Sequence, residues 1–342
     1  MQEQSTRMYR EAAQAPQAVR DQLVANTERM QRLGERLREL SPRAVVTCAR
    51  GSSDHAATFA KYLIETRLGV LTSSAAPSVS SVYDAKPDLA GTVFLAISQS
   101  GASPDLLAAA NSAREAGALI VALVNAESSP LAQAADHAVP LGAGIEKSVA
   151  ATKSYIASLA AIVHLVANWA RDRELADALA RAPQLLERAW ALDWSAPLTR
   201  LRSASNLYVV GRGLGLGVAQ EAALKFKETC GLHAEAISAA ELRHGPMALV
   251  RAGFPVLIFA QNDETRGGVE MLAAELVARQ ADVMLAGSHC PGAVILPTEG
   301  APAVIEPMLI VQSFYRMVNA LSLARGHDPD RPPYLNKVTE TV

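Results

Sequence analysis

The sequence has little cysteine and almost no net charge, and each of these two shortages argues against a class of protein. Three of the 342 residues are cysteine, an odd and scattered set that argues against a disulfide framework and for a reducing compartment. The formal net charge is −2, so the chain lacks the basic face that nucleic-acid binding normally needs. The seven histidines show no paired metal-ligand spacing, and no Cys-x-x-Cys motif occurs. We expect neither a metal nor a nucleic-acid partner.

Long apolar runs are also missing. The longest apolar stretch, residues 155–170, is interrupted by Ser158, His164 and Asn168 and is shorter than a bilayer span, so it predicts a buried helix. The first seven residues are polar, and no apolar core of a signal peptide follows them. With 50 % hydrophobic and 19 % charged residues, the composition is that of a globular protein long enough for two domains. We therefore expect a cytoplasmic protein with no membrane partner.

What the chain does contain is a loop rich in small hydroxyl side chains, Ser98-Gln99-Ser100-Gly101-Ala102-Ser103. It follows a short apolar run at 92–97, which predicts a buried parallel strand, and it precedes Pro104 and Asp105, which mark a helix start. Backbone N–H groups and the helix dipole favour an anion there, and the serine hydroxyls add donors. The pattern is neither a Walker A motif nor a dinucleotide fingerprint. It predicts a phosphate site, with an ordinary strand-to-helix turn as the alternative.

Two strand-loop-helix units repeat along the chain at a single offset. Arg212 lies 162 residues after Arg50, and Ala260 lies 162 residues after Ser98, each in a matching strand and loop. Each half has the order strand, loop, helix, strand, loop, helix, followed by a third apolar run. This order predicts an α/β fold with two tandem, doubly wound parallel sheets.

The repeat also predicts domain limits and assigns the anion to one half. The second-half loop carries Asp263 and Glu264 where the first half has serines, and carboxylates repel phosphate. We therefore expect the phosphate in the first half, with the second half supplying catalytic groups. The expected segments are N-terminal helices in 1–34, a first domain in 35–192, a second domain in 193–326 and a C-terminal tail in 327–342.

Candidate catalytic groups follow in the second half. Glu221, Lys225 and Glu228 fall at i, i+4 and i+7 of a predicted helix and share one face. On a solvated helix such a stripe is a set of ion pairs worth a few tenths of a kcal/mol each. His244 follows on a segment that Gly245 and Pro246 end, which brings a second polar group to a fold that places ligands at strand ends. The set is suited to general acid-base chemistry.

The C-terminus adds one further cation. Two prolines at 332 and 333 predict an extended arm that carries Lys337. Such an arm is either a frayed tail or a segment that folds over the site and delivers an ammonium group.

These segments resemble the sugar isomerase, or SIS, domain family, in particular the isomerase half of glutamine:fructose-6-phosphate amidotransferase and stand-alone relatives that deaminate glucosamine 6-phosphate. The resemblance covers nearly the whole chain and implies two flavodoxin-like SIS domains. The segments that carry it are Gly51-Ser52-Ser53, Ser98 to Ser103, Val149-Ala150-Ala151-Thr152-Lys153, Glu221 to Glu228, His233 to Ala236, Glu241 to Pro246 and Leu335-Asn336-Lys337.

The resemblance implies a role for each matching residue. Glu228 would move a proton between C1 and C2 of the open-chain sugar, His244 would assist ring opening, and Glu221 would orient that histidine. Lys225 would stabilise the enolamine charge, and Lys337 would reach in from the tail. The family pattern also implies a homodimer whose site lies at the subunit interface, with the neighbour supplying the equivalent of His244. The residues expected to bind the sugar phosphate are Gly51, Ser52, Ser53, Ser98, Gln99, Ser100, Ser103, Val149, Ala150 and Ala151.

The chain departs from the amidotransferase pattern in three respects. Ala151 stands where that pattern has serine, and Arg50 and Asp54 flank Gly51-Ser52-Ser53 where it has other residues. The sequence shows no glutaminase half before the first domain and no cysteine before Cys48, so we expect that ammonia does not come from glutamine through an N-terminal thiol.

The missing glutaminase half favours the deaminating direction. We expect a glucosamine-6-phosphate deaminase that releases fructose 6-phosphate and ammonia without a metal or redox cofactor. The alternatives are a deglycase acting on fructosamine 6-phosphates, a galactosamine-phosphate deaminase, an aldose-ketose isomerase, or a non-catalytic sugar-phosphate sensor. A sensor needs the phosphate loop but has no use for the proton-transfer groups.

Overall fold

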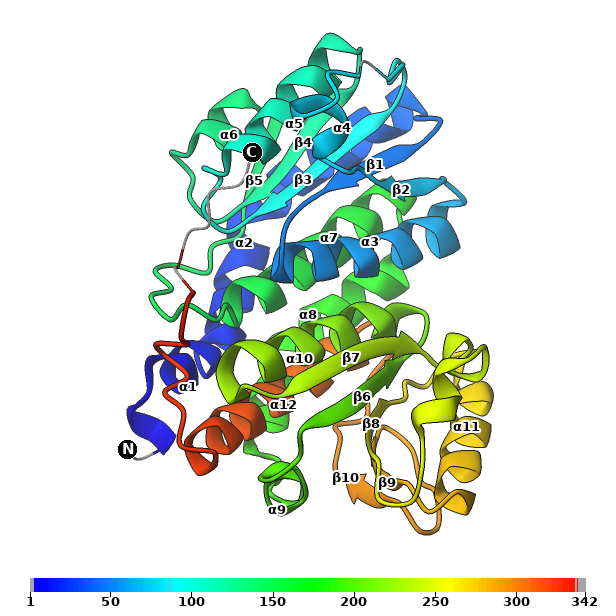
Figure 1. The fold of residues 1–342 in the computed structure, drawn as a ribbon. Coiled ribbons are helices and arrows are strands. Elements are labelled where there is room, and N and C mark those ends of the chain that lie inside the picture. The colour runs from blue at the N-terminus through cyan, green and yellow to red at the C-terminus, as the bar shows by residue number, and fades with distance from the viewer. Residues whose placement is uncertain (1–2, 86, 336, 338–342) are drawn as a thin grey trace. The chain divides into compact units, whose positions relative to one another are not determined.

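Two five-stranded parallel sheets organise the chain (Figure 1). The computed structural model describes residues 3–85, 87–335 and 337. The first sheet has the order β2-β1-β3-β4-β5 and the second has the order β7-β6-β8-β9-β10. The strands are β1 Val45–Cys48, β2 Thr72–Ser74, β3 Val93–Ser98, β4 Leu119–Val124, β5 His137–Pro140, β6 Asn206–Gly211, β7 His233–Ser238, β8 Pro255–Phe259, β9 Asp282–Ala286 and β10 Val294–Leu296. The predicted pair of tandem parallel sheets is confirmed.

Helices cover both faces of each sheet. Figure 1 shows α3 and α7 on one face of the first sheet and α4, α5 and α6 on the other. In the second sheet, α10 and α12 cover one face and α11 covers the other (Figure 1). The α-helices are α1 Arg7–Ala12, α2 Ala15–Leu40, α3 Ser52–Leu68, α4 Ser78–Ser81, α5 Pro104–Glu115, α6 Pro130–Ala134, α7 Lys153–Ala170, α8 Arg173–Ala191, α9 Ala196–Leu201, α10 Leu214–Cys230, α11 Arg266–Ala278 and α12 Glu306–Ala324; the 3₁₀ helices are η1 Glu3–Ser5, η2 Glu241–Arg243 and η3 Pro246–Leu249.

The central strands are apolar because both of their faces are covered. All six residues of β3 are buried, and β4 has a single partly exposed residue, at its start. A parallel strand sandwiched between helix layers has no solvent face, so it reads as a continuous apolar run. The same reasoning explains α7, in which 15 of 18 residues are buried. Within the described residues no helix is long and apolar enough to cross a bilayer.

The chain divides into two compact units whose sequence segments interleave. One unit contains residues 1–16, 147–152 and 181–335, and the other contains 17–146, 153–180 and 336–342. The expected domain limits stay predictions, and most of the expected tail, residues 336 and 338–342, lies outside the described residues.

Candidate active site

The predicted phosphate loop leaves the carboxyl end of β3 and leads into α5. The hydroxyl of Ser98 accepts a hydrogen bond from the Gly101 N–H at 3.0 Å, which folds the loop back on the strand end. Ser103 is the N-cap residue of α5, but its hydroxyl caps no backbone N–H of the helix. Donors at the first turn of a helix usually find a side-chain acceptor or a ligand anion. The loop therefore has the local structure expected of a phosphate site.

Gly101 is the residue that lets this loop close. Its φ is +61°, and a Cβ atom there would lie 2.6 Å from the Cβ of Ser129 and 2.8 Å from a methyl carbon of Val124. The left-handed backbone and the missing space both exclude a side chain. Only glycine fits this position without moving the loop.

We expect Gly101→Ala to weaken sugar-phosphate binding at least about tenfold, a loss of about 1.4 kcal/mol. The added methyl group must push the loop away from Ser129 and so displace the donors of the phosphate site. Calorimetry with glucosamine 6-phosphate measures the change. Gly267→Ala is the matched control, because a Cβ there meets open space. Equal affinity in Gly101→Ala and the wild type would show that the loop does not bind the phosphate.

An ion pair joins the first turn of α5 to the end of the first strand, β1. Arg50, just after β1, donates from Nε and Nη2 to Oδ2 of Asp105 at 2.8 and 2.6 Å. The Asp105 side chain is fully buried and also accepts the Leu106 N–H at 2.8 Å. Arg50 is followed by Gly51, the N-cap of α3, and by the first residues of that helix, Ser52 and Ser53. The predicted binding residues at 51–53 and 98–103 thus leave neighbouring strands at the same sheet edge.

The equivalent loop of the second half is filled by carboxylates of the chain itself. Asp263 accepts the Thr265 N–H at 2.9 Å and the Thr265 hydroxyl at 2.5 Å, and its other oxygen accepts from Gln261 at 2.7 Å. Glu306 accepts the Asn262 N–H at 2.5 Å. The carboxylates of Asp263 and Glu306 thus already accept the hydrogen bonds that a phosphate would need. The observation supports the expectation that phosphate binds in the first half.

The three predicted groups of the catalytic helix do lie together on α10. Lys225 Nζ is 3.2 Å from Glu221 Oε1 and 2.7 Å from Glu228 Oε2. The side chains of Glu221 and Lys225 are completely buried, whereas that of Glu228 is 19 % exposed. The hydroxyl of Tyr315, from α12, donates to Glu221 Oε1 at 2.9 Å. This is a buried network that opens to solvent at Glu228, and not a solvated ion-pair stripe.

The network keeps Lys225 charged. Burial by itself lowers the pKa of Lys225, but the Coulombic attraction and hydrogen bonds of Glu221 and Glu228 outweigh it, so the pKa lies above its ordinary value. Lys225 is therefore a fixed cation and cannot serve as a base near neutral pH. Glu228 is the acceptor of the network that a substrate can reach.

His244 lies in the same unit as this network. It ends η2 and is exposed, and Gly245 follows it with a φ of +126°. The described hydrogen bonds of Glu221 reach Lys225 and Tyr315. Orientation of a histidine by Glu221 stays a prediction.

A residue of the N-terminal helices forms hydrogen bonds to the backbone just before 149–151, the segment expected to line the sugar site. The carboxylate of Glu11, on α1, accepts the Lys147 N–H at 2.6 Å and the Ser148 N–H at 3.0 Å. Val149, Ala150 and Ala151 follow directly in the sequence, with Ala150 fully buried. Glu11 holds the start of this segment through both of its oxygens.

We expect Glu11→Gln to destabilise the protein by about 1–3 kcal/mol, because the amide NH₂ of glutamine must face one of the two N–H donors. Urea unfolding measures the loss, and KM for the sugar phosphate should rise with it. Glu28→Gln, an exposed change on α2, is the control and should stay within about 0.5 kcal/mol. If the two variants are equally stable, Glu11 does not anchor the segment.

Lys337 contacts a buried carboxylate in its own unit. Its Nζ lies 3.6 Å from Oε2 of Glu146, a side chain that is completely buried. The same oxygen accepts the Ser154 hydroxyl at 2.6 Å. Delivery of this ammonium to a substrate stays a prediction. Sequence reasoning missed Glu11, Glu146 and Tyr315, because nothing local marks a residue whose partner is distant in sequence.

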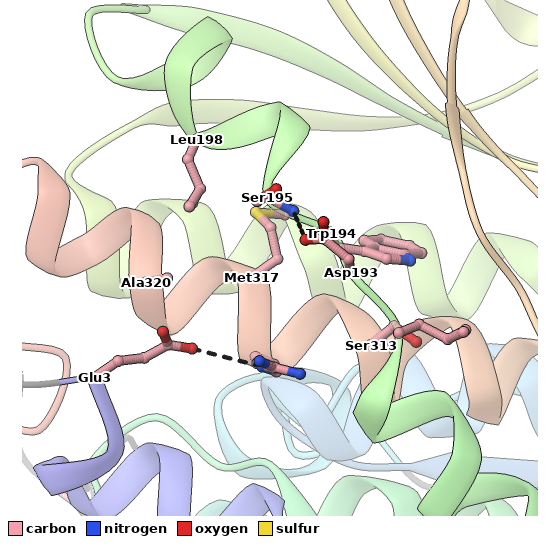
Figure 2. Close-up of a pocket in the computed structure, with 10 residues that line it drawn as sticks. Glu3, Asp193, Trp194, Ser195, Leu198, Ser313, Met317 and Ala320 are labelled. Atoms are coloured by element: carbon pink, nitrogen blue, oxygen red, sulfur yellow. Dashed lines mark hydrogen bonds and ion pairs between the residues drawn. The ribbon is translucent and has the colours of Figure 1, made fainter.

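The described residues hold no metal cluster, and the small cavity beside Trp194 is lined by none of the predicted site residues. Across residues 3–85, 87–335 and 337, no group of three or more His, Cys, Asp or Glu side chains is placed to hold a metal ion. A cavity of about 70 Å³ lies in the unit that contains the second sheet, and Figure 2 shows residues that line it. Its labelled lining residues include Trp194, Ser195 and Ser313, and none of the predicted site residues lines it. It has room for only a few water molecules.

Comparison with known proteins identifies the class. The SIS domain family model matches residues 40–168 and 200–287. The chain is 35 % identical over 311 residues to a protein of Aeropyrum pernix named glutamine–fructose-6-phosphate aminotransferase (isomerizing). The aligned region covers 85 % of this chain and 50 % of that protein. The chain spans little more than half the length of such curated relatives.

Two solved structures extend the match over nearly the whole chain. One, from Silicibacter pomeroyi and provisionally named a phosphosugar isomerase, shares 42 % identity with a TM-score of 0.91, over 95 % of this chain and 100 % of that one. The other is the C-terminal domain of glucosamine-fructose-6-phosphate aminotransferase from Francisella tularensis, with 25 % identity and a TM-score of 0.87, over 96 % of this chain and 98 % of that one. The chain belongs to the SIS domain family.

Proposed function

We propose that the protein is a sugar-phosphate isomerase of the SIS class that acts as a glucosamine-6-phosphate deaminase. The observation that carries the proposal is the buried Glu221–Lys225–Glu228 network on α10. A protein that only senses a sugar phosphate needs a phosphate loop but no fixed cation beside a reachable carboxylate. The names of the relatives from Aeropyrum pernix and Silicibacter pomeroyi support the sugar-phosphate class.

The proposed reaction begins with phosphate capture and ring opening. Ser98, Gln99, Ser100 and Ser103 bind the phosphate through hydroxyl, amide and backbone donors at the start of α5. His244 transfers a proton during opening of the pyranose, which exposes the C1 aldehyde and the acidic C2–H bond.

Proton transfer then converts the aldose into the ketose. Glu228 removes the proton from C2, and the electron pair forms the C1=C2 double bond of an enolamine while the C1 oxygen takes up a proton. The ammonium of Lys225 stabilises the negative charge that develops in this step. Glu228 returns the proton to C1, which leaves a protonated imine (iminium) at C2. Water adds to the imine, ammonia departs, and fructose 6-phosphate remains.

The cysteines of the chain support free ammonia as the nitrogen species. Burial raises the pKa of Cys48 and of Cys230 to about 12, and Cys290 is buried as well. Neither Cys48 nor Cys230 is therefore a thiolate near neutral pH that could attack glutamine. We also propose a homodimer in which the exposed His244 acts on the substrate of the neighbouring subunit.

The test is to incubate the full chain with glucosamine 6-phosphate and to measure fructose 6-phosphate and ammonia separately. Equimolar release of both products is expected. Galactosamine 6-phosphate, which differs only at C4, shows which sugar is preferred. If the protein binds glucosamine 6-phosphate but releases neither product, the deaminase proposal is wrong.

A further inference from the structure

Tyr315 contacts the catalytic network from a second helix. Its hydroxyl donates to Glu221 Oε1 at 2.9 Å, and that oxygen is also the one 3.2 Å from Lys225 Nζ. Tyr315, Glu221 and Lys225 all have no exposed surface. Helix α12 packs along α10, with the ring centroids of Phe314 and Phe226 5.1 Å apart in an edge-on contact. The hydroxyl is thus placed at Glu221 by packing between two helices.

Aromatic packing alone does not call for a hydroxyl at this position. Phe259 and Phe314 show that unsubstituted rings are accommodated in the same part of the core. A buried hydroxyl without a hydrogen-bond partner would cost about 1–3 kcal/mol. The hydroxyl therefore needs an acceptor there, and the acceptor it contacts is a carboxylate of the network.

The Tyr315 hydroxyl affects how strongly the Lys225 ammonium is attracted to each of its two carboxylate partners. Lys225 is a single cation between Glu221 and Glu228, so any negative charge on Glu221 competes with Glu228 for it. A hydrogen bond to a carboxylate stabilises its charge and weakens that competition. With Tyr315 in place, Lys225 lies closer to Glu228, at 2.7 Å, than to Glu221, at 3.2 Å.

We propose that Tyr315 is a positioning residue that, through Glu221, keeps Lys225 directed at Glu228 and so keeps Glu228 ionised as the catalytic base. The inference rests on the proposed function of Glu228. Tyr315 itself is buried behind Glu221 and does not touch the substrate.

The other charged or titratable groups near α10 are placed differently. Arg325, the C-cap residue of α12, donates to the carbonyl of Cys230 at the end of α10, more than a helical turn beyond Lys225. On β7, His233 and Glu235 are exposed, and β6 and β8 carry no charged residue. Glu221, Glu228 and Tyr315 are therefore the groups described against Lys225.

The test is the pH dependence of kcat/KM in Tyr315→Phe, which removes the hydroxyl and keeps the ring. We expect the acid limb to move up by about one pH unit, because Lys225 shifts toward Glu221 and Glu228 is harder to keep ionised. At a given pH on the acid limb kcat/KM should therefore fall by about tenfold, whereas on the plateau above it the two proteins should react at similar rates. Ser313→Ala is the matched control: it removes a buried hydroxyl of α12 that donates to the carbonyl of Ala189 at 2.7 Å and touches no carboxylate. It should leave the acid limb in place.

A double variant separates positioning from packing. Because Tyr315 acts through the charge of Glu221, Tyr315→Phe should have little further effect on the acid limb in a Glu221→Gln background. An unchanged acid limb in the single variant, or an equal shift in Ser313→Ala, would overturn the inference. An additive shift in the double variant would do the same.

A measurement without turnover keeps this test distinct from that of the proposed function. In protein labelled with ¹³C at the glutamate carboxyl carbons, the resonance of Glu228 should titrate at higher pH in Tyr315→Phe than in the wild type. A wild type with no deaminase activity contradicts the proposed function, and the resonance still decides the role of Tyr315. Active wild type with identical titrations in both proteins contradicts the inference alone.

Discussion

Glu228→Gln is expected to lower kcat for deamination by about 10²- to 10⁴-fold, the usual contribution of a positioned general base. Glutamine keeps the size of the side chain and can still contact Lys225, but it cannot accept the proton from C2. KM should change little, because the phosphate loop of the other unit is untouched. The measurement is steady-state release of ammonia and fructose 6-phosphate, with Glu174→Gln as an exposed control on α8.

The pattern of the loss distinguishes a base from a structural residue. A base variant keeps its fold and its affinity for the sugar phosphate while kcat collapses. If Glu228→Gln instead turns over at the wild-type rate, another group carries the proton and the assignment fails.

The second large effect is expected on stability. Lys225→Met removes the cation from a buried site and leaves Glu221 without its charge partner. Removing one member of a buried ion pair typically costs about 3–5 kcal/mol, because the remaining charge has no compensation. Urea unfolding at pH 7 measures the loss, and activity should vanish as well. Lys227→Met is the control, since Lys227 is exposed on the same helix.

The pH dependence of stability follows from the raised pKa of Lys225. A lysine whose pKa is higher in the folded than in the unfolded state stabilises the fold fully below its unfolded pKa, near 10.5, and loses that contribution as pH rises through the folded pKa. A Lys225→Met variant as stable as the wild type at pH 7 would show that the network is not a buried ion pair.

The sequence was most informative where structure depends on local pattern. The buried strands β3 and β8, the loop after β3 and the start of α5 at Pro104 all follow from runs of neighbouring residues. Glu221, Lys225 and Glu228 could be grouped because helix geometry alone places i, i+4 and i+7 on one face.

Other features depend on the fold and left no local signal. Tyr315 reaches Glu221 across 94 residues, and Glu11 reaches Lys147 across 136. A tyrosine in an apolar helix is indistinguishable in sequence from a core residue. All four edge strands were missed: β2 and β10 have only three residues each, and β5 and β7 mix polar and partly exposed residues with apolar ones, so none of them reads as an apolar run.

The central claim is that Glu228 moves the C2 proton of a bound amino-sugar phosphate. The most direct test uses glucosamine 6-phosphate deuterated at C2, with wild type and Glu228→Gln compared. We predict that the wild type reacts more slowly with this substrate than with the unlabelled one and that the deuterium is found at C1 of fructose 6-phosphate or in water. Glu228→Gln should leave it at C2. Wild type that binds the substrate without breaking the C2 bond, or Glu228→Gln that breaks it equally fast, would contradict the account.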